Sequence, residues 1–231
     1  FEFAVAAYRF GHSQVRPSYR LNFGAAPGSE FFGFLFDDSA DPNDPDPNDT
    51  RGGKRAPRRF VDWQTFFKLD AVNFRPNKLI DSKLSTPLML LRGSRGPAPG
   101  LPNDGVQSLA SRNLMRHVNF GIPSGQAIAR VMGAQVLTPA QLAELVPFKM
   151  DQSTPLWYYL LKEAEVLEQG LRLGPVGSRI VGEVFIGLLK ADKDSYLVVD
   201  KNWKPTLPSA KSGDFEITDL LTFAGVVHPL Q

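Results

Sequence analysis

The sequence lacks several features that would define other classes of protein. Its 231 residues contain no cysteine, so disulfides, thiolate nucleophiles and iron–sulfur ligation are excluded. No apolar run approaches the about 18 residues of a membrane span. The GxGxxG and P-loop phosphate-binding patterns are also absent. The net charge is only +2, so neither nucleic acid nor an anionic membrane is indicated as a partner.

What is present favours a helical protein. Hydrophobic residues make up 42% of the chain, enough for a core, while 19 prolines and 20 glycines predict long connections. We therefore expect an all-α, mainly helical fold with long irregular connections, as a single domain over residues 1–231. The apolar periodicity and the capping residues predict helices over about 2–16, 60–69, 106–118, 125–132, 138–145, 156–169, 175–190 and 218–223.

Residues 24–59 are the least regular part of the sequence. The apolar run SEFFGFLF predicts a short strand or a buried turn. An acidic stretch, DDSADPNDPDPNDT, and a basic one, RGGKRAPRR, follow it. The spaced carboxylates suggest calcium, but a calcium loop also needs a glycine at its sixth position and a closing glutamate. We therefore predict a solvated, mobile loop over 37–59.

One histidine stands in a pattern suited to iron. His12 follows Arg9 by three residues, and residues three apart share a face of a helix. A neutral imidazole is a common axial ligand of haem iron, and arginine matches the haem propionates with a fork of donors. Asn113 and Arg116 repeat the spacing: one of them could accept from the imidazole N–H, the other could bind a second propionate. The ordinary alternative is a histidine of the core or surface.

Longer motifs carry a family resemblance. The segment AAYRFGHSQVRPSYRLN, with its aromatic-Arg-aromatic-Gly-His pattern, resembles the proximal-histidine segment of the animal-type haem peroxidases, the peroxidase–cyclooxygenase superfamily, in its bacterial branch. The segment SLASRNLMRHVNFGIPSGQAIARVMG resembles that family's later helix. The segments RFVDWQTFF, LIDSKLSTPL, TPLWYYLLKEAEVLEQGLRLGPVGSRIVGEVFIGLLKAD and FEITDLLTFAG are similar to further parts of it, in order along the chain.

The resemblance implies roles for individual residues. His12 would be the proximal ligand of a haem b iron, Asn113 its hydrogen-bond partner, and Arg9 and Arg116 the propionate partners. The implied activity is that of a haem-dependent peroxidase, which reduces hydrogen peroxide and oxidises an organic donor or a halide. In the fatty-acid dioxygenases of the superfamily, the residue three before the ligand is a radical-forming tyrosine. Here it is Arg9, with Tyr8 one position away, which favours a peroxidase.

The resemblance covers only the proximal half of the family's domain. The family's distal histidine, catalytic arginine and calcium loop precede the proximal helix, so we expect this chain to be the C-terminal half. Its partner would be the N-terminal half, as a separate or cleaved chain, with calcium as a possible further cofactor. His117 and His228 are expected to be structural or surface residues. The resemblance favours a secreted or extracellular protein.

Three other interpretations remain open. The chain could be a catalytically incomplete, peroxidase-like binding or adhesion module, because the distal segment is missing from this sequence. A fatty-acid dioxygenase-like enzyme is another interpretation, which Arg9 disfavours. The last is a helical domain without haem.

Overall fold

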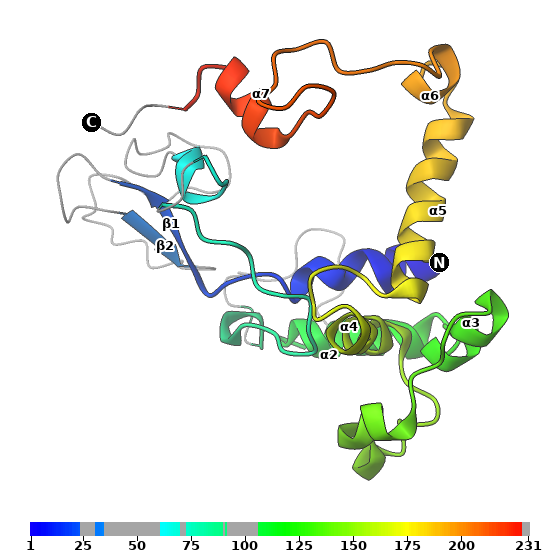
Figure 1. Cartoon of the computed structure of the whole chain (residues 1–231). Helices are drawn as coiled ribbons and strands as arrows, with labels where there is room; N and C mark the ends of the chain where they lie inside the picture. The colour runs from blue at the N-terminus through cyan, green and yellow to red at the C-terminus, as the bar shows by residue number, and fades with distance from the viewer. Residues whose placement is uncertain (24–30, 35–60, 70–72, 90, 92–105, 228–231) are drawn as a thin grey trace, which may run out of the picture. The chain divides into compact units, whose positions relative to one another are not determined.

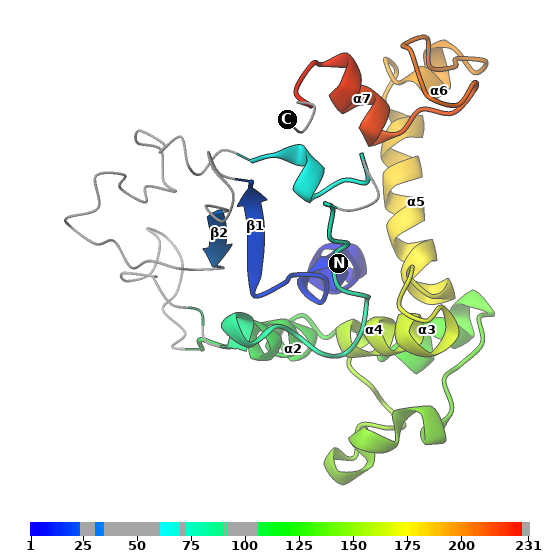
Figure 2. The same cartoon turned by 60° about the vertical axis from the view of Figure 1, so that its left-hand side comes forward.

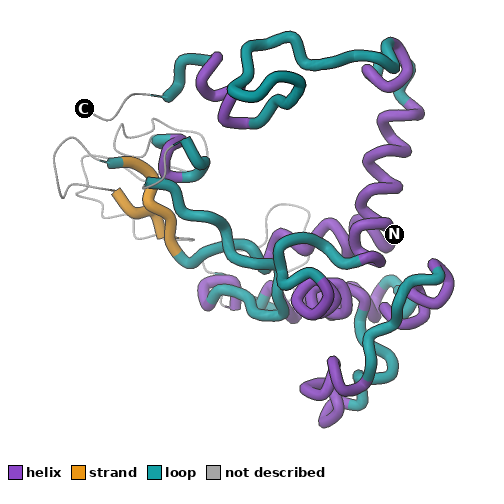
Figure 3. Tube along the Cα trace, in the orientation of Figure 1, coloured by secondary structure: helices purple, strands orange, loops and turns teal. Residues whose placement is uncertain are grey.

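The computed structural model describes residues 1–23, 31–34, 61–69, 73–89, 91 and 106–227. These residues are mainly helical, as predicted (Figures 1 and 3). The chain divides into two compact units, one formed by Phe1–Arg16 with Asn77–Val199 and the other by Pro17–Pro76 with Asp200–Gln231. The predicted single domain stays a prediction, and the predicted 37–59 loop lies outside the described residues.

The first unit is built around α4, Leu156–Leu167. Its buried side chains are at most 3% exposed and include Leu156, Trp157, Leu160, Leu161 and Ala164. The helix contacts α2 (Leu109–Asn119), α3 (Gly125–Met132), α5 (Pro175–Ala191) and the 3-10 helix η1 (Ala7–His12). Figures 1 and 2 show these elements gathered around it. The predicted apolar stripe of α4 is thus the core of the unit.

Several helices begin where local chemistry predicts. Ser124 caps α3 by accepting from Ala127 N–H. Thr138 and Gln141 form a capping box at the start of η5, Pro139–Phe148, with Pro139 in the first turn. Serine and threonine oxygens satisfy N–H groups that the helix itself leaves unbonded. The helix α2 is capped by Ser108, which accepts from Ser111 N–H.

The first predicted helix, over about 2–16, is wrong in its extent. The chain forms α1, Glu2–Val5, and then η1, Ala7–His12, with a break at Ala6, whose φ and ψ are −128° and −63°. The Ser13 hydroxyl donates to Phe10 O and Ser13 N–H donates to the same carbonyl. This satisfies the last turn locally, so the helix ends at His12 rather than at Arg16.

Close packing of α3 on α4 depends on one glycine. A Cβ at Gly125 would lie 2.0 Å from the ring of Tyr159. The Tyr159 hydroxyl in turn accepts from Leu137 N–H at 3.0 Å. The first residue of α3 therefore has to lack a side chain for the two helices to meet.

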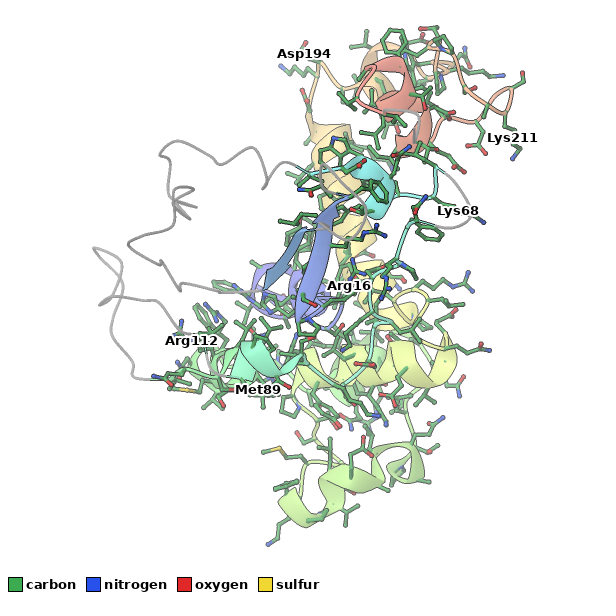
Figure 4. All side chains as sticks on the ribbon, turned by 90° about the vertical axis from the view of Figure 1, so that its left-hand side faces the viewer. Arg16, Lys68, Met89, Arg112, Asp194 and Lys211 are labelled. Carbon is green, nitrogen blue, oxygen red and sulfur yellow. The ribbon has the colours of Figure 1, made fainter. Side chains whose placement is uncertain are left out.

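Short elements complete the first unit. They are η4, Thr86–Met89, and α6, Tyr196–Val199. Met89 and Arg112 lie at the same end of α2 (Figure 4), where η4 contacts that helix. The helix α6 lies between the predicted helices over 175–190 and 218–223, where the sequence predicted no helix. No helix among the described residues is long and apolar enough to span a membrane.

The second unit contains the only strands among the described residues. Strand β1, Ser18–Asn22, pairs antiparallel with β2, Phe31–Phe34, with Ser18 opposite Phe34 and an irregularity between Arg20 and Asn22. The predicted apolar segment is thus a strand, paired in a two-stranded ladder. The unit also holds η3, Trp63–Thr65, and α7, Ile217–Phe223.

The helix α5 begins on a buried carboxylate. Glu163, which is fully buried in α4, accepts hydrogen bonds from Val176 N–H at 3.1 Å and Gly177 N–H at 3.2 Å. A Cβ at Gly174 would lie 2.3 Å from the Glu163 side chain. Burial raises the pKa of Glu163 to about 6, against the opposing effect of the two N–H donors.

We predict that Glu163→Gln changes the pH dependence of stability. Burial raises the Glu163 pKa from 4.5 to about 6, so protonated Glu163 stabilises the folded state relative to the unfolded chain. This contribution is complete below pH 4.5 and is lost as pH rises through 6. The loss is about 2 kcal/mol. The free energy of unfolding of the variant, relative to wild type, should therefore increase by about that amount between pH 4 and pH 7.

Chemical denaturation at a series of pH values measures this difference. Histidines whose pKa is lowered produce the opposite slope in both proteins, so only the difference between variants is informative. Glu183→Gln, on the exposed face of the same α5 helix, is the matched control and should follow wild type. A Glu163→Gln curve parallel to wild type would contradict the assignment.

Candidate functional site

The 3-10 geometry of η1 gives the segment three distinct faces. A 3-10 helix has three residues per turn, so residues i and i+3 lie one above the other. Ala7 and Ser13 are fully buried and Phe10 packs against the core. Arg9 and His12 therefore share a second face, as predicted. Tyr8, which is 56% exposed, lies on the third.

His12 meets Asn113 across the unit. The Asn113 side-chain nitrogen lies 2.8 Å from His12 Nδ1, although the two residues are 101 positions apart. Asn113 is 1% exposed, and its Oδ1 is buried without a hydrogen-bond partner among the described residues. The two ends of an asparagine amide have nearly the same shape, so a flipped amide would fit the same space. Oδ1 would then accept from Nδ1–H, as the sequence predicted.

The two amide orientations have different chemical consequences. With the nitrogen toward Nδ1, the imidazole must carry its proton on Nε2, and Nε2 has no lone pair to give. With Oδ1 toward Nδ1, the proton sits on Nδ1 and Nε2 has a free lone pair. The flip gives Oδ1 a hydrogen bond and places Nδ2 where Oδ1 lay, without a partner among the described residues. Only the flipped amide leaves His12 Nε2 able to bind a ligand.

Arg9 and Arg116 approach the same histidine without a counter-ion. Arg9 Nε is buried with no hydrogen-bond partner, and neither guanidinium forms an ion pair with the residues that the structure describes. Burial and the charge of Arg116 lower the pKa of Arg9. Arginine nonetheless stays protonated in proteins, so two cations converge on a face that holds no described anion.

The histidine is held in its neutral form. Burial is the largest cause of the lowered pKa of His12, and the charges of Arg9 and Arg116 lower this pKa further. Starting from an ordinary value of 6.5, a lowered pKa leaves the ring neutral near pH 7. Neutral imidazole is the form that ligates a metal.

Gly11 leaves open space beside the ligand candidate. A Cβ at Gly11 would meet no described atom within 4 Å. Its φ is not in the left-handed region, so neither close helix packing nor backbone conformation explains the glycine. Gly11 follows Tyr8 by three residues and so lies on the third face of η1, which is the exposed one.

Trp157 of α4 forms a hydrogen bond with the backbone of Arg9, at the beginning of the candidate site. Its indole N–H donates to the backbone oxygen of Arg9 at 3.2 Å, and the side chain is 3% exposed. The sequence placed Trp157 in the apolar stripe but missed this hydrogen bond. A tryptophan in a buried stripe usually finds a partner for its N–H, which is the signal that the sequence offered.

His117 belongs to a structural contact, as predicted. It follows Asn113 by one helical turn on α2, and its Nδ1 accepts from Leu156 N–H at 3.4 Å. This caps the first turn of α4. Burial lowers the pKa of His117, so the acceptor stays unprotonated near neutral pH. His228 lies outside the described residues.

The described residues contain no cluster of three or more histidine, cysteine, aspartate or glutamate side chains able to hold a metal ion. His12 is thus a single donor that would need a ligand set from elsewhere, such as a macrocycle. A scan against protein-family models found no match, and a search of curated proteins found none either. The case for function therefore rests on the geometry, and the family resemblance stays a prediction.

We predict that removing either arginine charge raises the pKa of His12. Arg9→Gln and Arg116→Gln should each shift it toward the ordinary value, because each removes a positive charge that opposes protonation. The larger shift is expected for Arg9. NMR titration of the ring protons gives the pKa directly. Arg179→Gln, whose guanidinium pairs with Glu183 on the surface, should have no effect, and an unchanged pKa in both site variants would refute the assigned electrostatics.

Proposed function

We propose that this chain forms the proximal side of a haem b site in a haem-dependent peroxidase. The observation that carries the proposal is the contact of His12 with Asn113, beside two arginines that form no ion pair with the described residues. Haem supplies four nitrogen ligands itself, so a single protein imidazole completes the proximal side. Haem also brings two carboxylates, the charge that Arg9 and Arg116 lack.

The residues present fit that group. His12 Nε2 would bind the iron, and Asn113 would hold the imidazole by accepting from Nδ1–H. Arg9 Nε is buried without a described partner, and buried polar atoms normally have partners. When bound, haem iron supplies the redox chemistry that reduces hydrogen peroxide and oxidises an organic donor or a halide.

The protein's own contribution is orientation and electrostatics. A hydrogen bond donated by Nδ1–H raises the basicity of the imidazole and would thereby change the reduction potential of a bound haem iron. An amide oxygen is a weaker acceptor than a carboxylate, so this effect is modest. Moving a proton between the two peroxide oxygens needs a distal acid–base group. We expect it from the N-terminal half of the peroxidase domain, which precedes the proximal helix in the family that the sequence resembles.

Tyr8 supports a peroxidase over a fatty-acid dioxygenase. The dioxygenase-type radical tyrosine would stand at position 9, on the face that η1 shares with His12. Tyr8 lies on another face, where it stacks on Phe3 with ring centroids 4.9 Å apart and meets the edge of Phe185 at 5.7 Å. It is therefore part of a surface aromatic cluster.

A binding role without turnover is the second candidate. It is favoured by apolar side chains that α5 leaves uncovered, Phe185 at 43%, Ile186 at 44% and Leu188 at 62% exposed. Exposed apolar residues in one region are typical of interaction surfaces. Oxidation of a dye that depends on peroxide separates the two candidates, because a haem-binding scaffold would give a spectrum without turnover.

We predict that the chain mixed with haem shows a Soret band that depends on His12. His12→Ala should lose or strongly shift the band, because the axial donor is gone. Added imidazole should restore it by entering the space left by the ring. His117→Ala, which also removes an imidazole from this unit, should keep the wild-type spectrum. The absence of a Soret band in wild type would contradict the proposal.

We also predict that Gly11→Ala separates stability from haem binding. Alanine is favoured over glycine in a helix by about 1 kcal/mol, and the new methyl group meets no described atom. The variant should be as stable as wild type or more so in thermal unfolding. Gly11 lies on the face of η1 with Tyr8 and not on that of Arg9 and His12, so haem affinity, followed by absorbance titration, should stay at the wild-type value. A strong loss of affinity would contradict the assignment of these faces.

A further inference from the structure

The carbonyls of three consecutive residues after His12 are all held by one distant segment. Lys78 Nζ donates to Ser13 O at 3.1 Å. Lys78 N–H donates to Gln14 O at 3.3 Å. The Ser85 hydroxyl donates to Val15 O. We call the segment from Lys78 to Ser85 the clamp.

The clamp is itself anchored on the core of the first unit. Ile80 is 3% exposed, and its N–H donates to Gly170 O at 2.8 Å. The Ser82 hydroxyl donates to Glu165 of α4 at 3.1 Å. A Cβ at Gly170 would lie 2.8 Å from the Leu79 side chain, so the chain approaches closely here. The clamp therefore holds the end of η1 in a fixed position relative to α4.

Lys78 is the side chain at the centre of this arrangement. Its amine also donates to Lys83 O at 2.6 Å and lies 3.6 Å from Asp81. Three donors of one ammonium group thus meet three oxygens. The amine is half-buried, whereas the neighbouring Lys83 is exposed.

The position of the clamp along the chain explains why a clamp is needed. The first unit stops at Arg16 and resumes at Asn77, so the chain leaves four residues after His12 and returns at the clamp. Trp157 fixes the backbone at Arg9, before the histidine. Without a second anchor after it, the His12 backbone would be held from one side only.

We propose that Lys78 is a positioning residue that keeps His12 in register with Asn113. The geometry requires two helices to hold their relative place for the 2.8 Å contact between those side chains to persist. Lys78 acts through the Ser13 carbonyl, one residue from the histidine, and does not touch the ring. The inference concerns the His12–Asn113 pair, and only its consequence for haem rests on the proposed function.

The experiment compares Lys78→Met with wild type in the full chain. Methionine keeps the apolar stem and removes the amine. Without haem, amide exchange followed by NMR should become about tenfold faster for the Asn113 side chain and for Ser13 and Gln14 N–H, the effect of losing a charged hydrogen bond. Amides in the middle of α4 should be unchanged. Lys83→Met is the matched control.

The second arm uses the same variants with haem. The reduction potential and the electron paramagnetic resonance spectrum of the ferric protein report on the axial ligand, and neither would change if Lys78 only added stability. Lys78→Met should shift both and weaken haem binding about tenfold, as for other partners of a metal ligand. Lys78→Arg, which keeps a donor toward Ser13 O, should restore the wild-type values.

The two arms separate the two proposals. Faster exchange in Lys78→Met with no haem bound by wild type would support the positioning role and reject the haem site. Unchanged exchange of the Asn113 amide in a folded Lys78→Met would overturn the positioning role. If that variant unfolds, Ser85→Ala tests the other end of the clamp: it should speed exchange of the Asn113 amide, and a wild-type rate there would overturn the role equally.

Discussion

The site depends on the hydrogen bonding of a single 3-10 turn. In Ala7–His12 the side chains repeat every three residues, so one face is buried, one carries Arg9 and His12, and one is exposed. Residues three apart also share a face of an α-helix, with their directions about 60° apart. The 3-10 form places them directly above one another, so it aligns the guanidinium and the imidazole more closely. The Ser13 hydroxyl donates to the backbone oxygen of Phe10 and so closes the end of this turn.

Electrostatics at this turn are unfavourable until an anion arrives. Burial is the largest cause that lowers the pKa of His12, and the charges of Arg9 and Arg116 lower it further. Both arginines are partly exposed, so water screens part of the repulsion between these charges. A ligand with negative charges and an electron-pair acceptor for His12 would offset the repulsion that remains.

Local chemistry made part of the structure predictable. The helix α3 was predicted with its observed bounds, because Ser124 caps one end and Gly133, at φ 65°, closes the other. The starts of η5 and α5 followed from Thr138 and from Pro175. The spacing of Arg9 and His12 predicted their common face, whereas the pairing of His12 with Asn113, 101 positions away, was expected only from the family resemblance. The helix caps are interactions between residues close in sequence.

The rest depended on distant partners. Leu188 of α5 is 62% exposed and Met115 of α2 is 42% exposed, although each belongs to the apolar periodicity of its helix. Both lie on the apolar face of a helix. The sequence pattern of such a face does not show how far along the helix other elements cover it. The Lys78 amine meets Ser13, 65 positions away. Nothing in the sequence around Lys78 distinguishes it from Lys83.

The helix α4 relates these distant partners to one another. Trp157 holds Arg9, Glu163 holds the start of α5, and His117 caps the first turn from α2. Each of these contacts joins a polar atom to a backbone group, inside a core that is otherwise apolar. Such bonds fix orientation more than they add stability, because each replaces a bond to water. The apolar face of α4 supplies the stability, and its few polar contacts determine where His12 and Asn113 meet.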